Sequence, residues 1–153
     1  MKLRELVDLI PNAVVQGNID IDIEIKGISN HSQRVSPGDL FVCISGIPGY
    51  QVDRHPYAKD AVRAGAVAVV AERGVDVHDV PVIFVKNSRH ALAVLCAHFY
   101  GYPSSELKLI GVTGTYGKTT TSHMIEAIFR YAGHKTGLMG NIGTKIGDTL
   151  YKT

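Results

Sequence analysis

The chain has 153 residues, of which 45% are hydrophobic, and this is enough for one ordinary domain or for one and a half small ones with a buried core. Its 16 Lys and Arg residues and 14 Asp and Glu residues are scattered, and without a basic run that could follow a phosphate backbone we expect no nucleic-acid binding. The apolar stretches are too short to span a membrane and the N-terminus does not resemble a signal peptide, so we expect a cytoplasmic protein without membrane insertion.

The chain up to Gly101 alternates between two apolar patterns. Alternating or continuous apolar residues are typical of strands, and a spacing of three to four residues is typical of helices. The predicted strands are residues 19–25, 40–44, 66–71 and 82–85. The predicted helices are residues 3–10, residues 57–64 and a segment that follows a cap at Asn87 or Ser88. This alternation predicts an α/β fold with a largely parallel sheet.

Turn-forming residues at 100–106 separate this part from a second unit. We therefore expect one domain over residues 1–105 and the start of another over residues 106–153. The second unit is predicted to contain a strand at 107–112, a glycine-rich loop, a helix at 118–132 and a strand at 135–139. One β-α-β unit cannot bury both faces of a sheet, so we expect this second domain to be unfinished within the 153 residues.

The glycine-rich loop of the second unit has the composition of a phosphate-binding loop. Phosphate binding uses glycines that let backbone N–H groups approach oxygens, a helix N-terminus, a lysine for the β- and γ-phosphates, and a hydroxyl for Mg²⁺. Gly114, Gly117, Lys118 and Thr119 supply these groups, although the first glycine stands closer to the lysine than in the common form of this loop. The alternative is a glycine-rich turn followed by an exposed lysine.

Three segments of the chain resemble the Mur ligase superfamily, which includes the folylpolyglutamate synthetases. Residues 113–121, T-G-T-Y-G-K-T-T-T, are similar to its T-G-T-N-G-K-T-T loop. Residues 27–42 resemble the D-S-R-x-V-x-P-G-D-L-F-V segment of its uridine-nucleotide-binding domain, and residues 50–55 resemble the region of its D-G-H pattern. The resemblance covers nearly the whole chain and is strongest to the ligases that add the third amino acid of the peptidoglycan stem peptide.

The resemblance implies two sets of binding residues. Those that contact the uridine nucleotide of a UDP-N-acetylmuramoyl dipeptide are Asn30, Ser32, Tyr50, Gln51 and Val52. Those that bind ATP are Gly114, Thr115, Tyr116, Gly117, Lys118, Thr119 and Thr120. Within the second set, Lys118 is the expected catalytic residue and Thr119 the expected Mg²⁺ ligand. Thr120 could instead simply fill the first turn of the helix, and each residue of the first set could be an ordinary loop residue.

By resemblance, the parent enzyme phosphorylates the terminal carboxylate of the muramoyl dipeptide with ATP, and an amine of diaminopimelate or lysine then displaces phosphate to form an amide. The chain departs from the family pattern at His31, Gln33, Arg54 and Tyr116, and residues 47–49 stand as an insertion. The family's remaining catalytic groups lie outside this sequence, so we expect the chain alone to be inactive. Two alternatives stay open: a ligase that adds the final dipeptide, and a non-catalytic module that binds a nucleotide sugar.

Overall fold

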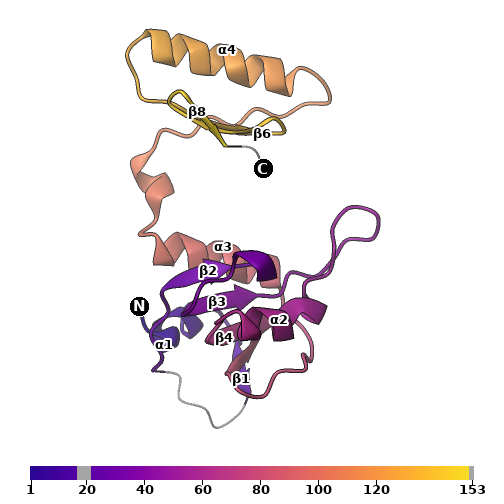
Figure 1. Cartoon of the computed structure of the whole chain (residues 1–153). Helices are drawn as coiled ribbons and strands as arrows, with labels where there is room; N and C mark the ends of the chain where they lie inside the picture. The colour runs from indigo at the N-terminus through magenta and orange to yellow at the C-terminus, as the bar shows by residue number, and fades with distance from the viewer. Residues whose placement is uncertain (17–21, 152–153) are drawn as a thin grey trace. The chain divides into compact units, whose positions relative to one another are not determined.

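A computed structural model of the chain describes residues 1–16 and 22–151. The chain divides into two compact units, Met1–Leu107 and Lys108–Thr153, which are called unit 1 and unit 2 below (Figure 1). A short 3-10 helix, η3 (Pro103–Glu106), ends unit 1. The division therefore falls close to the turn-forming segment at 100–106.

Unit 1 is built on a mixed five-stranded sheet in the order β1-β5-β4-β3-β2. Its strands are β1 (Val14–Gln16), β2 (Gly27–Ser29), β3 (Asp39–Val42), β4 (Ala68–Ala71) and β5 (Val82–Phe84). Strands β2 to β5 are parallel, with Leu40 opposite Ala68 and Val70 opposite Ile83, whereas β1 is antiparallel to β5. The predicted α/β fold with a largely parallel sheet is confirmed for this unit.

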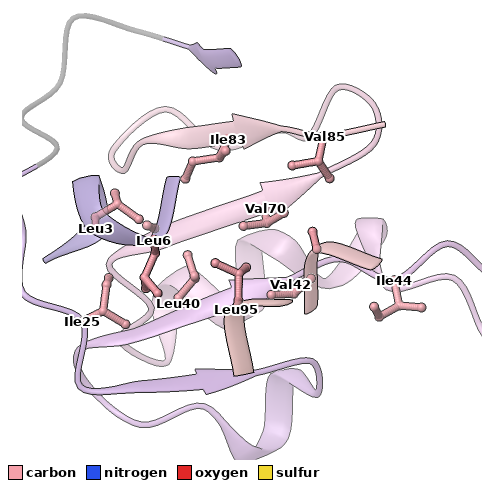
Figure 2. Packing of buried hydrophobic residues seen from close by; sticks show 12 residues of the cluster. Leu3, Leu6, Ile25, Leu40, Val42, Ile44, Val70, Ile83, Val85 and Leu95 are labelled. Atoms are coloured by element: carbon pink, nitrogen blue, oxygen red, sulfur yellow. The ribbon is translucent and has the colours of Figure 1, made fainter. Parts of the chain in front are cut away.

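Helices cover both faces of this sheet. On one face α1 (Leu3–Val7) and α3 (Ser88–Phe99) pack through Leu3, Leu6 and Leu95 against side chains of the strands, and Figure 2 shows this cluster. On the other face α2 (Ala58–Arg63) packs its alanines against Phe41 and Val69. Successive residues of β3 and β4 point to opposite faces, so these two inner strands supply both cores. Among the described residues, no helix is long and apolar enough to cross a membrane.

The turn before β3 is held against the end of α2. The Gly38 N–H donates to the Gly65 carbonyl at 2.9 Å, and the Asp39 carboxylate accepts the Ser36 N–H at 2.8 Å. Gly65 has φ +110°, and a Cβ atom there would lie 2.8 Å from Pro37 Cα. Only glycine satisfies both the backbone angle and this close approach. Residues 37–39, the P-G-D of the segment that resembles the Mur ligase superfamily, thus connect the start of β3 to the end of α2.

The N-terminal elements are shorter than predicted. Helix α1 ends at Val7, although residues 3–10 have helical spacing. Of the predicted strand at 19–25, residues 19–21 lie outside the described residues. The Leu3 N–H donates to the Ile23 carbonyl at 2.8 Å and the Ile25 N–H donates to the Met1 carbonyl at 2.7 Å. Residues 23–25 thus pair with the N-terminus of the chain, and the strand β2 begins only at Gly27.

Unit 2 consists of one helix and a small antiparallel sheet. The helix is α4 (Lys118–Tyr131), and the sheet contains β6 (Gly137–Gly140), β7 (Gly143–Ile146) and β8 (Thr149–Tyr151) in that order. Buried Glu126 of α4 accepts a hydrogen bond from the Thr136 hydroxyl at 2.9 Å and pairs with Lys145 of β7 at 3.3 Å. These polar contacts connect the helix to the sheet.

Two expectations for unit 2 were wrong. Residues 108–113 have no regular secondary structure, so the predicted strand at 107–112 does not form, and Leu109 is 71% exposed. The predicted strand at 135–139 forms as β6, but it pairs antiparallel with β7 rather than completing a parallel β-α-β unit. A strand needs a neighbour for its N–H and C=O groups, and β6, β7 and β8 pair with one another. The expected phosphate-loop β-α-β unit is therefore not formed in this chain.

Candidate functional site

The predicted uridine-nucleotide residues lie at the carboxyl edge of the unit 1 sheet. Asn30 directly follows β2, and Ser32 begins the 3-10 helix η1 (Ser32–Arg34). Tyr50, Gln51 and Val52 lie in the loop that follows the adjacent parallel strand β3. Ligands of open α/β sheets bind outside the carboxyl ends of the strands. The fold thus brings both predicted segments to one edge of the sheet.

The segment after β2 presents free polar groups. The Ser29 hydroxyl donates to the His31 carbonyl at 3.1 Å, and the His31 ring nitrogen Nδ1 accepts the Gln33 N–H at 3.3 Å. His31 therefore caps η1, which is a structural role. The side chains of Asn30 and Ser32 make no hydrogen bond within the described part of the chain. Both are therefore available to a ligand.

The loop after β3 is a tight hairpin turn. The Ile47 N–H donates to the Gln51 carbonyl at 2.9 Å, and the Gln51 N–H donates back to the Ile47 carbonyl at 2.8 Å. The apparent insertion at 47–49 lies in this turn. Tyr50 is 92% exposed and Val52 is 57% exposed. Exposed side chains of this kind, one of them aromatic, can pack against a nucleotide base.

A partly buried polar network that the sequence did not reveal supports this edge. Glu72, the first residue after β4, accepts the Ser88 N–H and hydroxyl, both at 2.7 Å, and also accepts the Ser45 hydroxyl. Burial acts to raise the pKa of Glu72, but the hydrogen bonds from Ser45 and Ser88 outweigh burial and hold this pKa below its ordinary value. Glu72 is thus a carboxylate that joins the ends of β3 and β4 to the start of α3.

Residues 53–55, which resemble the D-G-H pattern of the Mur ligase superfamily, belong to the same network. Asp53 accepts the His55 ring N–H at 2.7 Å and the His55 backbone N–H at 2.9 Å, and it pairs with Arg73. His55 Nε2 accepts the Glu72 N–H at 3.1 Å, which places the ring proton on Nδ1. Burial opposes ionisation of Asp53, but Arg73 and His55 hold its pKa well below the ordinary range. Buried His55 therefore has a structural role in this network.

The two cysteines are not activated nucleophiles. Burial, reinforced by the charge of Asp53, raises the pKa of the Cys43 thiol to about 12. Burial also raises the pKa of Cys96, which is half-buried. Both thiols stay protonated at neutral pH, so nucleophilic catalysis by cysteine has no support in this structure.

In unit 2 the glycine-rich loop leads directly into α4. Gly117 has φ +79° and precedes the first helical residue, Lys118. The Thr121 N–H donates to the Gly117 carbonyl at 2.9 Å, whereas the N–H groups of Lys118, Thr119 and Thr120 have no acceptor within the described residues. Unpaired N–H groups at the start of a helix of this length favour an anion. The glycine-rich loop therefore leads into a helix N-terminus whose first N–H groups are unpaired, and the assignment of a phosphate site there stays a prediction.

The side chains of this loop are consistent with nucleotide and Mg²⁺ binding. The Lys118 ammonium donates to the Gly114 carbonyl at 2.5 Å and to the Thr115 carbonyl at 3.4 Å, so it lies across the loop. Tyr116 is 93% exposed. No group of three or more His, Cys, Asp and Glu residues among the described residues could hold a metal. Mg²⁺ commonly takes few protein ligands besides phosphates and water, and the Thr119 hydroxyl, which has no hydrogen-bond partner within the described residues, fits that pattern.

Comparison with known families identifies both units. Residues 24–100 match the Mur ligase family, catalytic domain, and residues 112–153 match the Mur ligase middle domain. The chain belongs to the Mur ligase family. The predicted superfamily resemblance is therefore confirmed, and the matches lie on either side of the division between the two units.

Individual Mur ligases resemble this chain over nearly all of its length. It is 49% identical over 153 residues to the UDP-N-acetylmuramoyl-L-alanyl-D-glutamate--2,6-diaminopimelate ligase of Listeria monocytogenes, covering 100% of this chain and 30% of that ligase. The chain thus spans about 30% of the length of the curated relatives it matches.

Two solved structures bear on the fold. That of a UDP-N-acetylmuramoyl-L-alanyl-D-glutamate--2,6-diaminopimelate ligase superposes with a TM-score of 0.71 at 22% identity, covering 98% of this chain and 29% of that ligase. That of the MurF ligase of Thermotoga maritima in complex with ADP superposes with a TM-score of 0.55 at 29% identity, covering 82% of this chain and 27% of MurF. The first likeness supports the Mur ligase fold of this chain.

Proposed function

We propose that this chain forms the nucleotide-sugar-binding unit and the start of the ATP-binding unit of a ligase that acts on UDP-N-acetylmuramoyl-L-alanyl-D-glutamate. The observation that carries the proposal is the 49% identity, over all 153 residues, to the Listeria monocytogenes ligase named for that substrate. Of the two solved structures, that of the diaminopimelate-adding ligase superposes over more of the chain and with the higher TM-score, 0.71 against 0.55 for MurF of Thermotoga maritima. The curated relative and this superposition both favour a ligase that adds the third stem-peptide residue over one that adds the final dipeptide.

The acceptor in the proposed reaction is 2,6-diaminopimelate. The sequence left the choice between diaminopimelate and lysine open, and the name of the Listeria monocytogenes relative favours the former. In the proposed reaction the terminal carboxylate of the muramoyl dipeptide attacks the γ-phosphorus of ATP and ADP leaves. The amine of diaminopimelate then attacks the acyl carbon, phosphate leaves, and the nitrogen loses a proton. The proposed reaction takes place in the cytoplasm.

Unit 1 would hold the uridine nucleotide at its carboxyl edge. Asn30 and Ser32 supply polar side chains without partners in the described chain, and Tyr50 supplies an exposed ring. Gln51 and Val52 complete the loop on the adjacent strand. Two neighbouring loops at a strand edge can bind different parts of one nucleotide, so a single ligand could contact all five residues.

Unit 2 would hold the triphosphate. The N–H groups of Lys118, Thr119 and Thr120 would donate to phosphate oxygens, and the Lys118 ammonium would exchange the carbonyls of Gly114 and Thr115 for the oxygens of the γ-phosphate. The Thr119 hydroxyl would hold Mg²⁺, which when bound neutralises charge on the phosphates. Catalysis of this kind depends on positioning and charge stabilisation, which explains why no nucleophilic side chain is needed.

The proposal is tested by isothermal titration of the 153-residue chain with UDP-N-acetylmuramoyl-L-Ala-D-Glu. We expect saturable binding that weakens roughly tenfold in Ser32→Ala, because one hydrogen bond to the nucleotide is lost. Ser104→Ala, in η3, is the matched control and should bind like the parent chain. A folded parent chain that does not bind this nucleotide would contradict the substrate assignment.

A further inference from the structure

Arg89 sits at the start of α3, where the polar network fixes the helix terminus. The Asn87 side chain accepts the His90 N–H at 2.9 Å and caps the helix. Glu72 accepts the N–H and hydroxyl of Ser88, the residue before Arg89, at 2.7 Å. Both contacts come from residues that follow a strand of the sheet. The backbone that carries Arg89 is therefore held at the carboxyl edge, beside the proposed nucleotide site.

The Arg89 guanidinium reaches the loop after β3. It donates to the Ser45 carbonyl at 2.5 Å and to Gln51 Oε1 at 2.8 Å. A guanidinium has only donors, so the Gln51 carboxamide must meet it with its oxygen. A rotation that exchanged the oxygen and nitrogen of Gln51 would place two donors against each other. Arg89 therefore determines the orientation of the Gln51 carboxamide.

This orientation leaves the amide nitrogen of Gln51 facing away from Arg89. Gln51 Nε2 donates to no acceptor within the described residues, and Gln51 is exposed between the exposed side chains of Tyr50 and Val52. The loop thus offers an N–H donor from a residue whose two neighbours in the chain are exposed, one of them aromatic. A base with a carbonyl oxygen satisfies such a donor, and a base with an amino group at the same position does not.

We propose that Arg89 is a positioning residue that makes Gln51 present its N–H groups to the base of the bound nucleotide, and thereby selects uracil over cytosine. The inference rests on the proposed function, because it concerns the same nucleotide site. Uracil carries a carbonyl oxygen where cytosine carries an amino group. With Arg89 in place Gln51 can donate to uracil, whereas cytosine would place its own N–H groups against the Gln51 N–H. Without Arg89 the carboxamide is free to rotate and accept from cytosine.

The test measures dissociation constants of UDP and CDP for the full 153-residue chain and its variants by isothermal titration. We expect the parent chain to bind UDP roughly tenfold or more tightly than CDP, because the Gln51 N–H finds an acceptor on uracil but meets a donor on cytosine. In Arg89→Ala the preference should fall to within about twofold, because either carboxamide orientation becomes accessible. Arg89→Lys should retain most of the preference, since an ammonium also has only donors. Partial unfolding lowers the concentration of binding-competent chain equally for UDP and CDP, so it cannot change the ratio of their dissociation constants. This ratio therefore separates a positioning role of Arg89 from an effect on stability.

Two further variants complete the test. Arg63→Ala removes an exposed arginine that pairs with Asp60 in α2 at 3.8 Å, and it should retain the parent preference. Gln51→Glu keeps a partner for Arg89 but removes the N–H groups, so it should bind UDP no better than CDP. This substitution lies in an exposed loop and provides a test even if Arg89→Ala fails to fold.

The outcomes separate this inference from the proposed function. If Arg89→Ala retains the parent UDP preference while Ser32→Ala still weakens binding of the muramoyl nucleotide, the inference is overturned and the proposed function stands. Equal weakening of UDP and CDP in Arg89→Ala also overturns it, because the arginine then acts on the diphosphate. If the folded parent chain binds no uridine nucleotide at all, the proposed function fails and the inference fails with it.

Discussion

Unit 1 and unit 2 differ sharply in how much apolar surface they bury. Every buried hydrophobic side chain among the described residues lies in unit 1, between the sheet and the helices on its two faces. In unit 2 the buried positions within the described residues are Glu126 and Gly143, and Met124 and Ile128 of α4 are more than half exposed. A parallel sheet requires cover on both faces, whereas a helix and a hairpin can satisfy their own hydrogen bonds locally. Hydrogen-bonded elements alone therefore do not make a core.

The largest expected effect is the contrast between one large apolar side chain in each unit. Phe41→Ala in β3 should lower the free energy of unfolding by about 3–5 kcal/mol, because Phe41 is fully buried and its removal leaves a cavity. Ile128→Ala in α4 should change it by less than about 0.5 kcal/mol, because Ile128 is exposed. Urea unfolding followed by circular dichroism measures both. Equal losses in the two variants would show that Ile128 is covered.

A second prediction concerns the network that joins the strands of unit 1. Glu72→Gln should lower the free energy of unfolding by about 1–3 kcal/mol, because a neutral amide cannot accept from both serines as the carboxylate does. Glu106→Gln, at an exposed position of η3, is the matched control and should be close to neutral. If the two variants unfold at the same urea concentration, the network does not stabilise unit 1.

A third prediction is that unit 1 loses stability in acid. The pKa values of Asp53 and Glu72 are lowered in the folded chain, so their contribution is fully present above the unfolded-state pKa of about 4. It is lost as the pH falls from there through the lower folded-state values. The free energy of unfolding should therefore decrease between about pH 5 and pH 3, and the decrease should be smaller in Glu72→Gln. An identical pH dependence in that variant would contradict the assignment of Glu72.

The smallest expected effect lies in the glycine-rich loop of unit 2. Tyr116 stands where the family has asparagine, and its side chain is almost fully exposed. Tyr116→Asn should change the dissociation constant of Mg²⁺-ATP by less than about twofold, because in the proposed site the backbone N–H groups and Lys118 make the phosphate contacts. Lys118→Ala should weaken the same binding by roughly tenfold or more. A larger effect of Tyr116→Asn than of Lys118→Ala would reverse the roles proposed for them.

Prediction from sequence succeeded where a pattern is local. Asn87 caps α3 as its residue type suggested, and the buried strands of unit 1 appear where the apolar runs lie. It failed at residues 107–112, whose apolar residues have the pattern of a strand. Whether such a segment forms a strand depends on a second strand elsewhere in the chain to which it can hydrogen-bond. The apolar spacing of the segment does not show whether that second strand is present.

The sequence by itself determined the family and the α/β class of unit 1, and it predicted the loops that should contact a nucleotide, because these depend on short motifs and on apolar spacing. Only the tertiary structure placed the loops after β2 and β3 at one edge, and only it brought Glu72 and Arg89 to that edge. These contacts join residues far apart in the chain. A polar residue has no periodic signature, so its partner becomes visible only when the strands are in register.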